Sequence, residues 1–300
     1  MPLVPLAATL LAVIIWGLTP VAIRYLVAFV SPADLLVIRF SLSALIFIPL
    51  LWGLRLRQWT RRDVAVLAGS SLAALAGYNI PVTYGAQWVP AGLTGLLITT
   101  EPIWIVLISM LALRHRPDRP LVIGLIIAAA GVAVLLSNKE LMRDGGSSFL
   151  LGCGLILLGA FMWAVYCVLV PPLARKYGAM KSAAWVQTVG VIPLMLLWQP
   201  GLVERTALLH REAWLAIGFL VVFASALAVG LWNHGLSRLG SSHAGIFLYL
   251  IPLVTVLAGA LILGEQVGVR ELLSGALIVA GVAIAQVRVT SPAPVVAPGD

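Results

Sequence analysis

Long apolar runs separated by short charged segments dominate the pattern along this chain. A helix needs about 20 apolar residues to cross the roughly 30 Å hydrocarbon core of a membrane. Runs of that length recur throughout the sequence, without the alternation of apolar and polar residues that is typical of barrel strands. The pattern therefore predicts ten membrane-spanning helices, at residues 3–23, 35–54, 64–84, 91–113, 121–137, 149–173, 182–199, 213–236, 244–263 and 269–287.

The composition indicates an all-α protein that has lipid as its solvent. Of the 300 residues, 61% are hydrophobic and only 10% are charged, and the mean hydropathy is +1.07. A soluble domain carries about 25% charged residues, so the composition excludes a water-soluble enzyme and a disordered tether. The 28 glycines and 18 prolines fall largely within the apolar runs, where membrane helices tolerate them better than soluble helices do.

The net charge of +8 indicates the orientation of the chain and not a nucleic-acid partner, because the charges lie in short loops between the apolar runs. With the N-terminus in the cytoplasm, the inner loops hold 12 of the 19 basic residues and the outer loops hold six, and Arg39 lies inside a span. Cytoplasmic loops of membrane proteins carry an excess of Lys and Arg. Both termini are therefore predicted to be cytoplasmic.

The chain resembles itself after a shift of 150 residues, which aligns Pro102 with Pro252 and residues 130–133 with residues 280–283. Each half contains five predicted spans, an odd number, so the two halves would cross the membrane in opposite senses. Such a 5+5 inverted-topology repeat is the build of many secondary transporters. The expected organisation is a first repeat at 1–137, a polar connector at 138–148, a second repeat at 149–288 and a disordered tail at 289–300.

Several segments resemble the EamA repeat of the drug/metabolite transporter (DMT) superfamily. They are WGLTP at 16–20, AGLTGLLITTEPIWIVLISMLALRHRP, AFMWAVYCVL at 160–169 and SHAGIFLYLIPLVTVLAGALILGEQV. More narrowly, the chain is similar to bacterial amino-acid exporters of the YddG type. One departure is that Gly264-Glu265, which closes the second repeat, is matched by Arg114-His115 in the first. This glutamate is therefore not a duplicated functional element.

The resemblance implies a basket of ten helices around a central cavity, lined by the first, third, fourth, sixth, eighth and ninth spans. The fifth and tenth spans would give structural support or dimer contacts, in a monomer or a homodimer. The implied function is export of aromatic, hydrophobic and other amino acids, or related small metabolites, by alternating access across a bacterial inner membrane. The alternative within transport is efflux of drugs and lipophilic cations.

Glu101 lies near the middle of the fourth span, where a charge costs about 2.5 kcal/mol or more. Intramembrane acids of this kind usually face a cavity or a partner. One interpretation is a ligand for a substrate ammonium or a protonatable coupling group. The other is a protonated acid satisfied by Thr99, Thr100 or Asn79, or a structural pair with Arg39.

Four further residues are candidates for gating or structural roles. Arg39 either snorkels to the membrane interface or acts as a carboxylate clamp or outer gate, to which its planar donor fork is suited. Pro102 and Pro252 each lack a main-chain donor and interrupt their helices near the middle of the membrane. His234 is either a proton sensor or a structural residue near a helix end.

Aromatic and polar residues at depth complete the candidate site. Trp163 and Tyr166 share one face of the sixth span and are expected to face their repeat partners Trp16 and Thr19. Aromatic walls suit apolar side chains and ammonium groups, although such a stripe is also compatible with simple core packing. The expected cavity residues are Trp163, Tyr78, Asn79, Glu101, Trp16, Thr19, Thr99, Tyr166, Trp185 and Tyr249.

The sequence contains no phosphate-binding loop, zinc spacing or nucleophile elbow. We therefore expect neither an enzyme nor a nucleotide-driven pump, and neither a cofactor nor a metal. An intramembrane enzyme would need an acid–base pair between Glu101 and either His234 or Arg39, and a channel would need polar rings that no span provides. The two cysteines, Cys153 and Cys167, are expected to be inert apolar residues.

Overall fold

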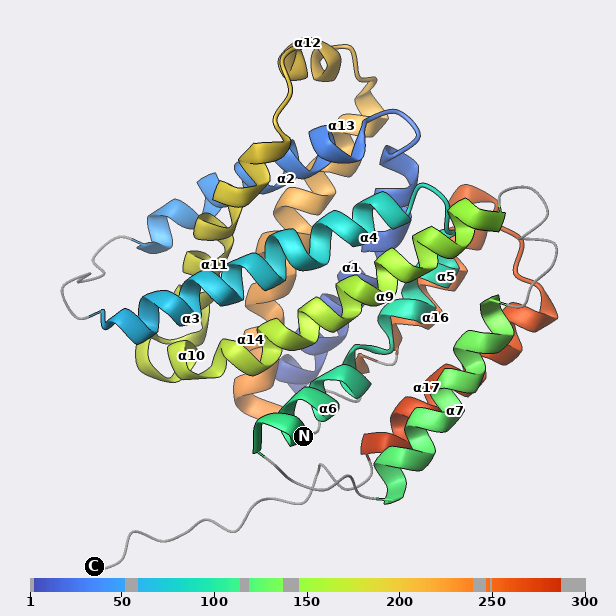
Figure 1. The fold of residues 1–300 in the computed structure, drawn as a ribbon. Helices are drawn as coiled ribbons and strands as arrows, with labels where there is room; N and C mark the ends of the chain where they lie inside the picture. Colours follow the sequence, from blue (N-terminus) through green and yellow to red (C-terminus); the bar gives the residue numbers. More distant parts are fainter. Residues whose placement is uncertain are drawn as a thin grey trace, which may run out of the picture.

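The computed structural model describes residues 3–51, 59–113, 119–136, 146–239, 247–248 and 250–286. Over these residues the chain is helical and contains no strand (Figure 1). Tyr249, residues 138–145 of the connector and the expected tail at 289–300 lie outside the described residues. Six of the described helices are long and apolar enough to cross a membrane, namely Leu3–Leu26, Pro32–Leu51, Arg61–Gly85, Gly146–Leu169, Met180–Leu197 and Arg211–Trp232.

Each of the ten predicted apolar stretches is helical over most of its described residues. The N-terminal half consists of α1 (Leu3–Leu26), α2 (Pro32–Phe47), η1 (Ile48–Leu51), α3 (Arg61–Ser71), η3 (Leu72–Asn79), α4 (Ile80–Gly85), α5 (Ala91–Ile98), α6 (Glu101–Leu113) and α7 (Arg119–Leu136). The C-terminal half consists of α9 (Gly146–Leu169), α10 (Pro171–Tyr177), α11 (Ala179–Leu194), η4 (Met195–Leu197), α12 (Leu202–Ala207), α13 (Arg211–Gly218), η5 (Phe219–Leu227), α14 (Ala228–Leu239), α16 (Leu250–Leu263) and α17 (Val269–Gln286). The chain is a multi-pass membrane protein.

Departures from α-helical geometry recur at a constant spacing along the chain. The π-helical segment η3 begins at Leu72 and the π-helical segment η5 at Phe219, 147 residues later. The 3₁₀ turns η1 and η4, which begin at Ile48 and Met195, are also 147 residues apart. Segments of π-helix are rare and often mark functional sites. The irregular segments thus occupy corresponding positions in the two halves, one at the end of the second helix and one within the third.

In each π-helical segment, one side chain donates a hydrogen bond to a main-chain carbonyl. The Asn79 side-chain amide donates to the Ala74 carbonyl at 2.8 Å, and the Ser225 hydroxyl donates to the Leu220 carbonyl at 2.9 Å. Each bond reaches back five residues. Lipid offers no partner to a main-chain group, so such internal bonds permit irregular helix in a membrane. The polar residue of each segment thus has a structural role in the described chain.

The stretch at 91–113, expected as one helix, is broken at Thr99 and Thr100 into α5 and α6. Pro102 provides no main-chain donor, so the helical hydrogen bond four residues earlier is lost. The Thr99 hydroxyl donates to the Gly95 carbonyl at 2.8 Å, and the Thr100 hydroxyl donates to the Leu97 carbonyl at 2.7 Å. These two bonds stabilise the break, at which α6 starts with Glu101.

Helices of one half pack mainly against helices of the other. Helix α1 contacts η5, α14 and α16, and α9 correspondingly contacts η3, α4, α5 and α6, while α2 packs on α11 and α7 on α17. In Figure 1 α7 and α17 run side by side at one edge of the bundle. Buried clusters join the halves, with Leu97 beside Ile156 in one cluster and Leu36 beside Leu194 in another. Apolar contacts between the halves therefore form much of the core.

Candidate functional site

Aromatic rings from η3 and α9 meet where the two halves of the chain pack together. The Tyr78 and Trp163 ring centroids are 5.1 Å apart, and the Trp163 and Tyr166 centroids are 4.9 Å apart. Aromatic pairs at such distances contribute about 0.5–1.5 kcal/mol beyond the burial of their area. The three side chains are only partly buried. They form an aromatic wall, defined here as Tyr78, Trp163 and Tyr166.

Glu101 begins α6, and its Oε1 atom is buried without a hydrogen-bond partner. The threonines and the asparagine that were the alternative partners do not bond to it. The side chains of Thr99, Thr100 and Asn79 each donate to a main-chain carbonyl of their own helical segment. The partial positive charge of a helix N-terminus favours an acid at this position, but it does not replace the missing hydrogen bond.

Arg39 is buried in α2, with only 7% of its surface exposed, and its Nε atom has no partner. Its guanidinium carbon lies 4.7 Å from the Phe40 ring centroid. No carboxylate among the described residues lies within salt-bridge distance of it, so the structural pair with Glu101 is absent. Phe40 belongs to the buried cluster against which Trp163 and Tyr166 pack. Arg39 and Glu101 therefore each have a buried side-chain atom without a partner, and they do not bond to each other.

Three partly buried indole N–H groups also lack partners, namely those of Trp59, Trp104 and Trp185. Trp104, one helical turn after Glu101, contacts Phe161 of α9 edge-on at 5.6 Å. Trp185 contacts Trp59 at 5.5 Å. Buried polar atoms are nearly always hydrogen-bonded in proteins, so unpaired donors are candidates for ligand contacts. Trp104 was not among the expected cavity residues, although its spacing of three from Glu101 places it on the same helix face.

The expected pairing of Trp16 and Thr19 with the Trp163 face does not occur. Trp16 contacts Trp232 at 5.4 Å, and its indole donates to the Ala224 carbonyl of η5 at 3.1 Å. The Thr19 hydroxyl donates to its own helix. These bonds satisfy the polar atoms of both side chains, which favours the structural interpretation of this pair. Trp16 and Trp163 belong to separate clusters.

The expected gating residues lie in different surroundings. Pro252 is buried in α16, and His234 is exposed on α14. Pro102 is the second residue of α6. Cys153 and Cys167 are free thiols, as expected. The structure therefore buries Pro252 and leaves His234 at the surface.

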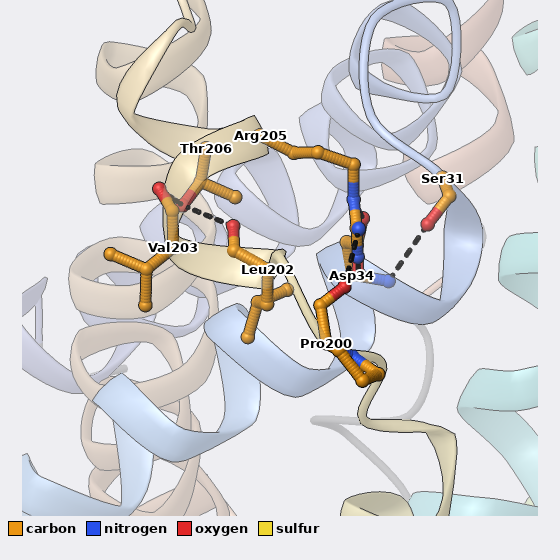
Figure 2. Close-up of polar contacts among 7 residues, drawn as sticks. All are labelled: Ser31, Asp34, Pro200, Leu202, Val203, Arg205 and Thr206. Carbon is orange, nitrogen blue, oxygen red and sulfur yellow. Dashed lines mark hydrogen bonds and ion pairs between the residues drawn. The ribbon is translucent and has the colours of Figure 1, made fainter.

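An ion pair joins α2 to α12 at one end of the helices (Figure 2). Arg205 donates to both carboxylate oxygens of Asp34, from Nε at 2.8 Å and from Nη2 at 2.9 Å, and its Nη1 donates to the Pro200 carbonyl at 2.8 Å. This bonding raises the pKa of Arg205. Asp34 is buried, and a cavity of about 250 Å³ lies beside the pair, lined in part by Val30 and Gln199.

A second ion pair joins α3 to α10 at the opposite end of the helices. Lys176 Nζ lies 2.5 Å from Asp63, and the Tyr177 hydroxyl donates to the same carboxylate at 3.0 Å. Bonding to Asp63 raises the pKa of Lys176. The acidic residue of each pair lies 142 positions before the basic residue of the other pair. Asp34 and Lys176 are separated by this number, and so are Asp63 and Arg205. Each pair joins the N-terminal half to the C-terminal half.

Glu265 has a structural role that its local sequence does not reveal. Its carboxylate accepts hydrogen bonds from the Ala91 amide at 2.8 Å and from the Gly92 amide at 3.1 Å. An acid at a helix N-terminus satisfies free amides and complements the helix dipole. Glu265 therefore caps α5 from a position 174 residues away. An apolar cavity of about 310 Å³ lies beside this cap, between α5, α16 and α17.

The sequence signature of the EamA-like transporter family matches the chain twice, at residues 4–137 and 150–286. The protein belongs to the EamA-like transporter family. This family is part of the DMT superfamily, so the resemblance noted in the sequence is confirmed. The family and the relatives of this chain are transporters.

Relatives of this EamA-like transporter cover nearly its whole length. An inner membrane transporter of Escherichia coli K12, YedA, is 30% identical over 302 residues, covering 99% of this chain and 96% of its own. An uncharacterized transporter of Archaeoglobus fulgidus is 27% identical over 277 residues, covering 91% and 95%. A probable terminal-alkyne amino-acid exporter of Streptantibioticus cattleyicolor is 26% identical over 278 residues, covering 92% and 91%.

The fold of the chain is similar to that of a solved protein. One crystal structure superposes with a TM-score of 0.61 at 22% sequence identity, covering 94% of this chain and 96% of the other. At this identity the similarity supports the arrangement of helices alone.

Proposed function

We propose that this protein is an inner-membrane secondary transporter that exports amino acids or related small metabolites. The observation that carries the proposal is the group of unpaired buried polar atoms on Arg39 and Glu101, beside an aromatic wall between the two halves. Intramembrane ionisable residues of this kind usually mark a substrate or ion pathway. The amino-acid exporter among the relatives and the inner membrane transporter of Escherichia coli support the substrate class and the location.

The architecture that we propose is a 5+5 inverted repeat with ten spans and both termini in the cytoplasm. The two matches to the family signature, one in each half, support it. The 147-residue spacing of the π-helical segments and of the 3₁₀ turns supports it independently. In this orientation the Asp34–Arg205 pair lies at the outer end and the Asp63–Lys176 pair at the inner end.

Alternating access would then open one ion pair while the other remains closed. Both pairs join the halves, and each has one partner that is more than 40% exposed, Arg205 at 44% and Lys176 at 42%. The accessible partner of each pair regains hydration when the pair breaks, so such a pair can open and re-form during a transport cycle. Two pairs of similar kind at opposite ends keep the outward-open and inward-open states close in free energy.

Reversing the charge of Arg205 is expected to open the outer end. The substitution Arg205→Asp places two carboxylates together and leaves the buried Asp34 without its partner, which disfavours the closed state. We expect a cysteine placed at Val30, which is 6% exposed, to react with a membrane-impermeant maleimide about tenfold faster, since each 1.4 kcal/mol changes a population tenfold. The reaction is measured in a background with Cys153→Ser and Cys167→Ser.

The double variant Asp34→Arg with Arg205→Asp restores the pairing in reverse and should return the labelling rate close to that of the parent. The exposed Arg211, at the start of α13, provides the control, because Arg211→Asp changes the charge of the same end without touching Asp34. Equal labelling in the parent and in Arg205→Asp would remove the gating role of this pair.

The function itself is tested by counterflow in proteoliposomes. Purified protein is reconstituted with an unlabelled amino acid inside, and uptake of the labelled amino acid from outside is followed across a panel of substrates and pH gradients. We expect uptake of apolar and aromatic amino acids above that of protein-free liposomes. Uptake of no amino acid on the panel would refute the proposed function, and a steady ionic current without exchange would favour a channel.

A further inference from the structure

We propose that the site selects zwitterions, with the substrate carboxylate bound by Arg39 and the substrate ammonium bound by Glu101. This inference rests on the proposed transport function and specifies its substrate class. It predicts that one molecule must carry both charges, so that simple amines and simple carboxylic acids are poor substrates.

The first step of the argument is that the two charged side chains are not partners of each other. A structural ion pair would explain why a membrane protein carries a buried arginine and a buried glutamate. Yet Arg39 Nε and Glu101 Oε1 are both buried without any hydrogen bond, and the described ion pairs involve other residues. Among the residues that the structure describes, neither group therefore has an ion-pair partner.

The second step is that both groups lie on helices that pack against the aromatic wall. Arg39 lies over the Phe40 ring of α2, and Phe40 belongs to the buried cluster against which Trp163 and Tyr166 pack. Trp104, one turn after Glu101 in α6, contacts Phe161 of α9, the helix that carries Trp163. A small molecule that contacts the wall would thus lie beside both helices that carry the charged side chains.

The third step concerns the chemistry that each group recognises. A guanidinium offers a planar fork of donors that matches a carboxylate, and Arg39 Nε is one donor of that fork still without an acceptor. A carboxylate beside aromatic rings suits an ammonium, which is attracted by the ring faces as well as by the negative charge. An α-amino acid carries both groups on its α-carbon, and its complex with an ionised Arg39 and Glu101 is neutral overall.

The wall formed by Tyr78, Trp163 and Tyr166 would contact the remaining part of the substrate. Its rings are held at fixed distances from one another, and apart from the tyrosine hydroxyls they offer apolar surface. We therefore expect neutral amino acids with apolar or aromatic side chains to be preferred. A charged side chain would bring a third charge into a region that already holds two.

The experiment compares three molecules of one shape in the counterflow assay, namely L-phenylalanine, phenethylamine without the carboxylate and 3-phenylpropanoate without the ammonium. Wild-type protein should exchange L-phenylalanine at least about tenfold faster than either analogue, because a site built around a polar group rejects ligands that leave it unpaired. Arg39→Gln should lower the rate of phenylalanine exchange and increase the ratio of the phenethylamine rate to the phenylalanine rate. Glu101→Gln should lower the rate of phenylalanine exchange and increase the ratio of the 3-phenylpropanoate rate to the phenylalanine rate.

Matched controls make these shifts specific. Arg211 and Glu212 are exposed neighbours at the start of α13, so Arg211→Gln and Glu212→Gln make the same chemical changes away from the site and should leave all three rates unchanged. Arg39→Lys retains the charge and should recover part of the preference for phenylalanine over phenethylamine. If Arg39→Gln does not fold, protection of the wild type against heat by phenylalanine but by neither analogue tests the same selection.

The outcomes separate this inference from the function on which it rests. Exchange of phenethylamine as fast as phenylalanine by the wild type, lost only in Glu101→Gln, would overturn the zwitterion site in favour of efflux of lipophilic cations. An equal fall of all three rates in both variants would overturn it in favour of purely structural charges. In either case transport persists in the wild type, whereas absence of all exchange would refute the transport function itself.

Discussion

Replacing Trp163 with alanine is expected to lower the exchange of aromatic amino acids at least tenfold. Trp163 is the central ring of the aromatic wall, because it contacts both Tyr78 and Tyr166. Its removal deletes the surface that would contact the substrate and leaves Tyr78 without its ring contact from α9. A tenfold change corresponds to a loss of about 1.4 kcal/mol in interaction with the substrate.

The measurement is the initial rate of counterflow per amount of reconstituted protein, with folded protein verified by size-exclusion chromatography. Trp198→Ala is the matched control, since this tryptophan is 54% exposed after η4 and its removal should leave the rate unchanged. Trp163→Phe retains a ring and should keep more of the rate than Trp163→Ala does. A folded Trp163→Ala protein with the wild-type rate would show that the wall does not contact the substrate.

The length and polarity of the apolar runs were sufficient to predict where the helices lie. Each run is helical because lipid leaves the main chain no other partner, and this requirement depends only on local sequence. The break at Thr99 and Thr100 and the π-helical segments were not predicted as such. They depend on a few side-chain bonds, such as that of Asn79, whose geometry the pattern of apolar residues does not contain.

The candidate site was predicted in part, for a similar reason. Arg39 and Glu101 are identified by the high cost of a charge inside a membrane, and Trp163 and Tyr166 by their spacing on one helix. That Trp16 would join Trp232 and not Trp163 depends on how α1 packs against η5 and α14. Nothing local in the sequence specifies that choice.

Contacts between the halves were the least accessible to sequence reasoning. Asp34 and Arg205 are 171 residues apart, and Glu265 lies 174 residues from the amide of Ala91 that it caps. Each of these residues, taken alone, looks like an ordinary charged residue near a helix end. Their roles appear only when the helices of the two halves are brought together, which is also what makes these positions informative about gating.

The close contact between α7 and α17 leads to the expectation that Gly281→Leu largely prevents folding. A Cβ atom at Gly281 would lie 2.5 Å from the Ala128 amide nitrogen and 2.6 Å from the Gly124 carbonyl oxygen. Both are main-chain atoms of α7, so the strain is relieved only by separating the two helices. Overpacking a core costs about 1–3 kcal/mol and sometimes more, and we expect a lower monodisperse yield and a lower apparent melting temperature in detergent.

Gly154→Leu is the matched control for this loss, because a Cβ atom at Gly154 meets nothing within 4 Å. Leucine is also the better helix former, by roughly 0.5–1 kcal/mol, so this variant should be at least as stable as the parent. Helices α7 and α17 lie at one edge of the bundle (Figure 1), and no described residue of either helix belongs to the cluster that contains Trp163. The fraction of Gly281→Leu that does fold should therefore bind and exchange phenylalanine with the parental KM. A normal yield with an altered KM would contradict the supporting role of this helix pair and would instead assign α7 and α17 to the transport pathway.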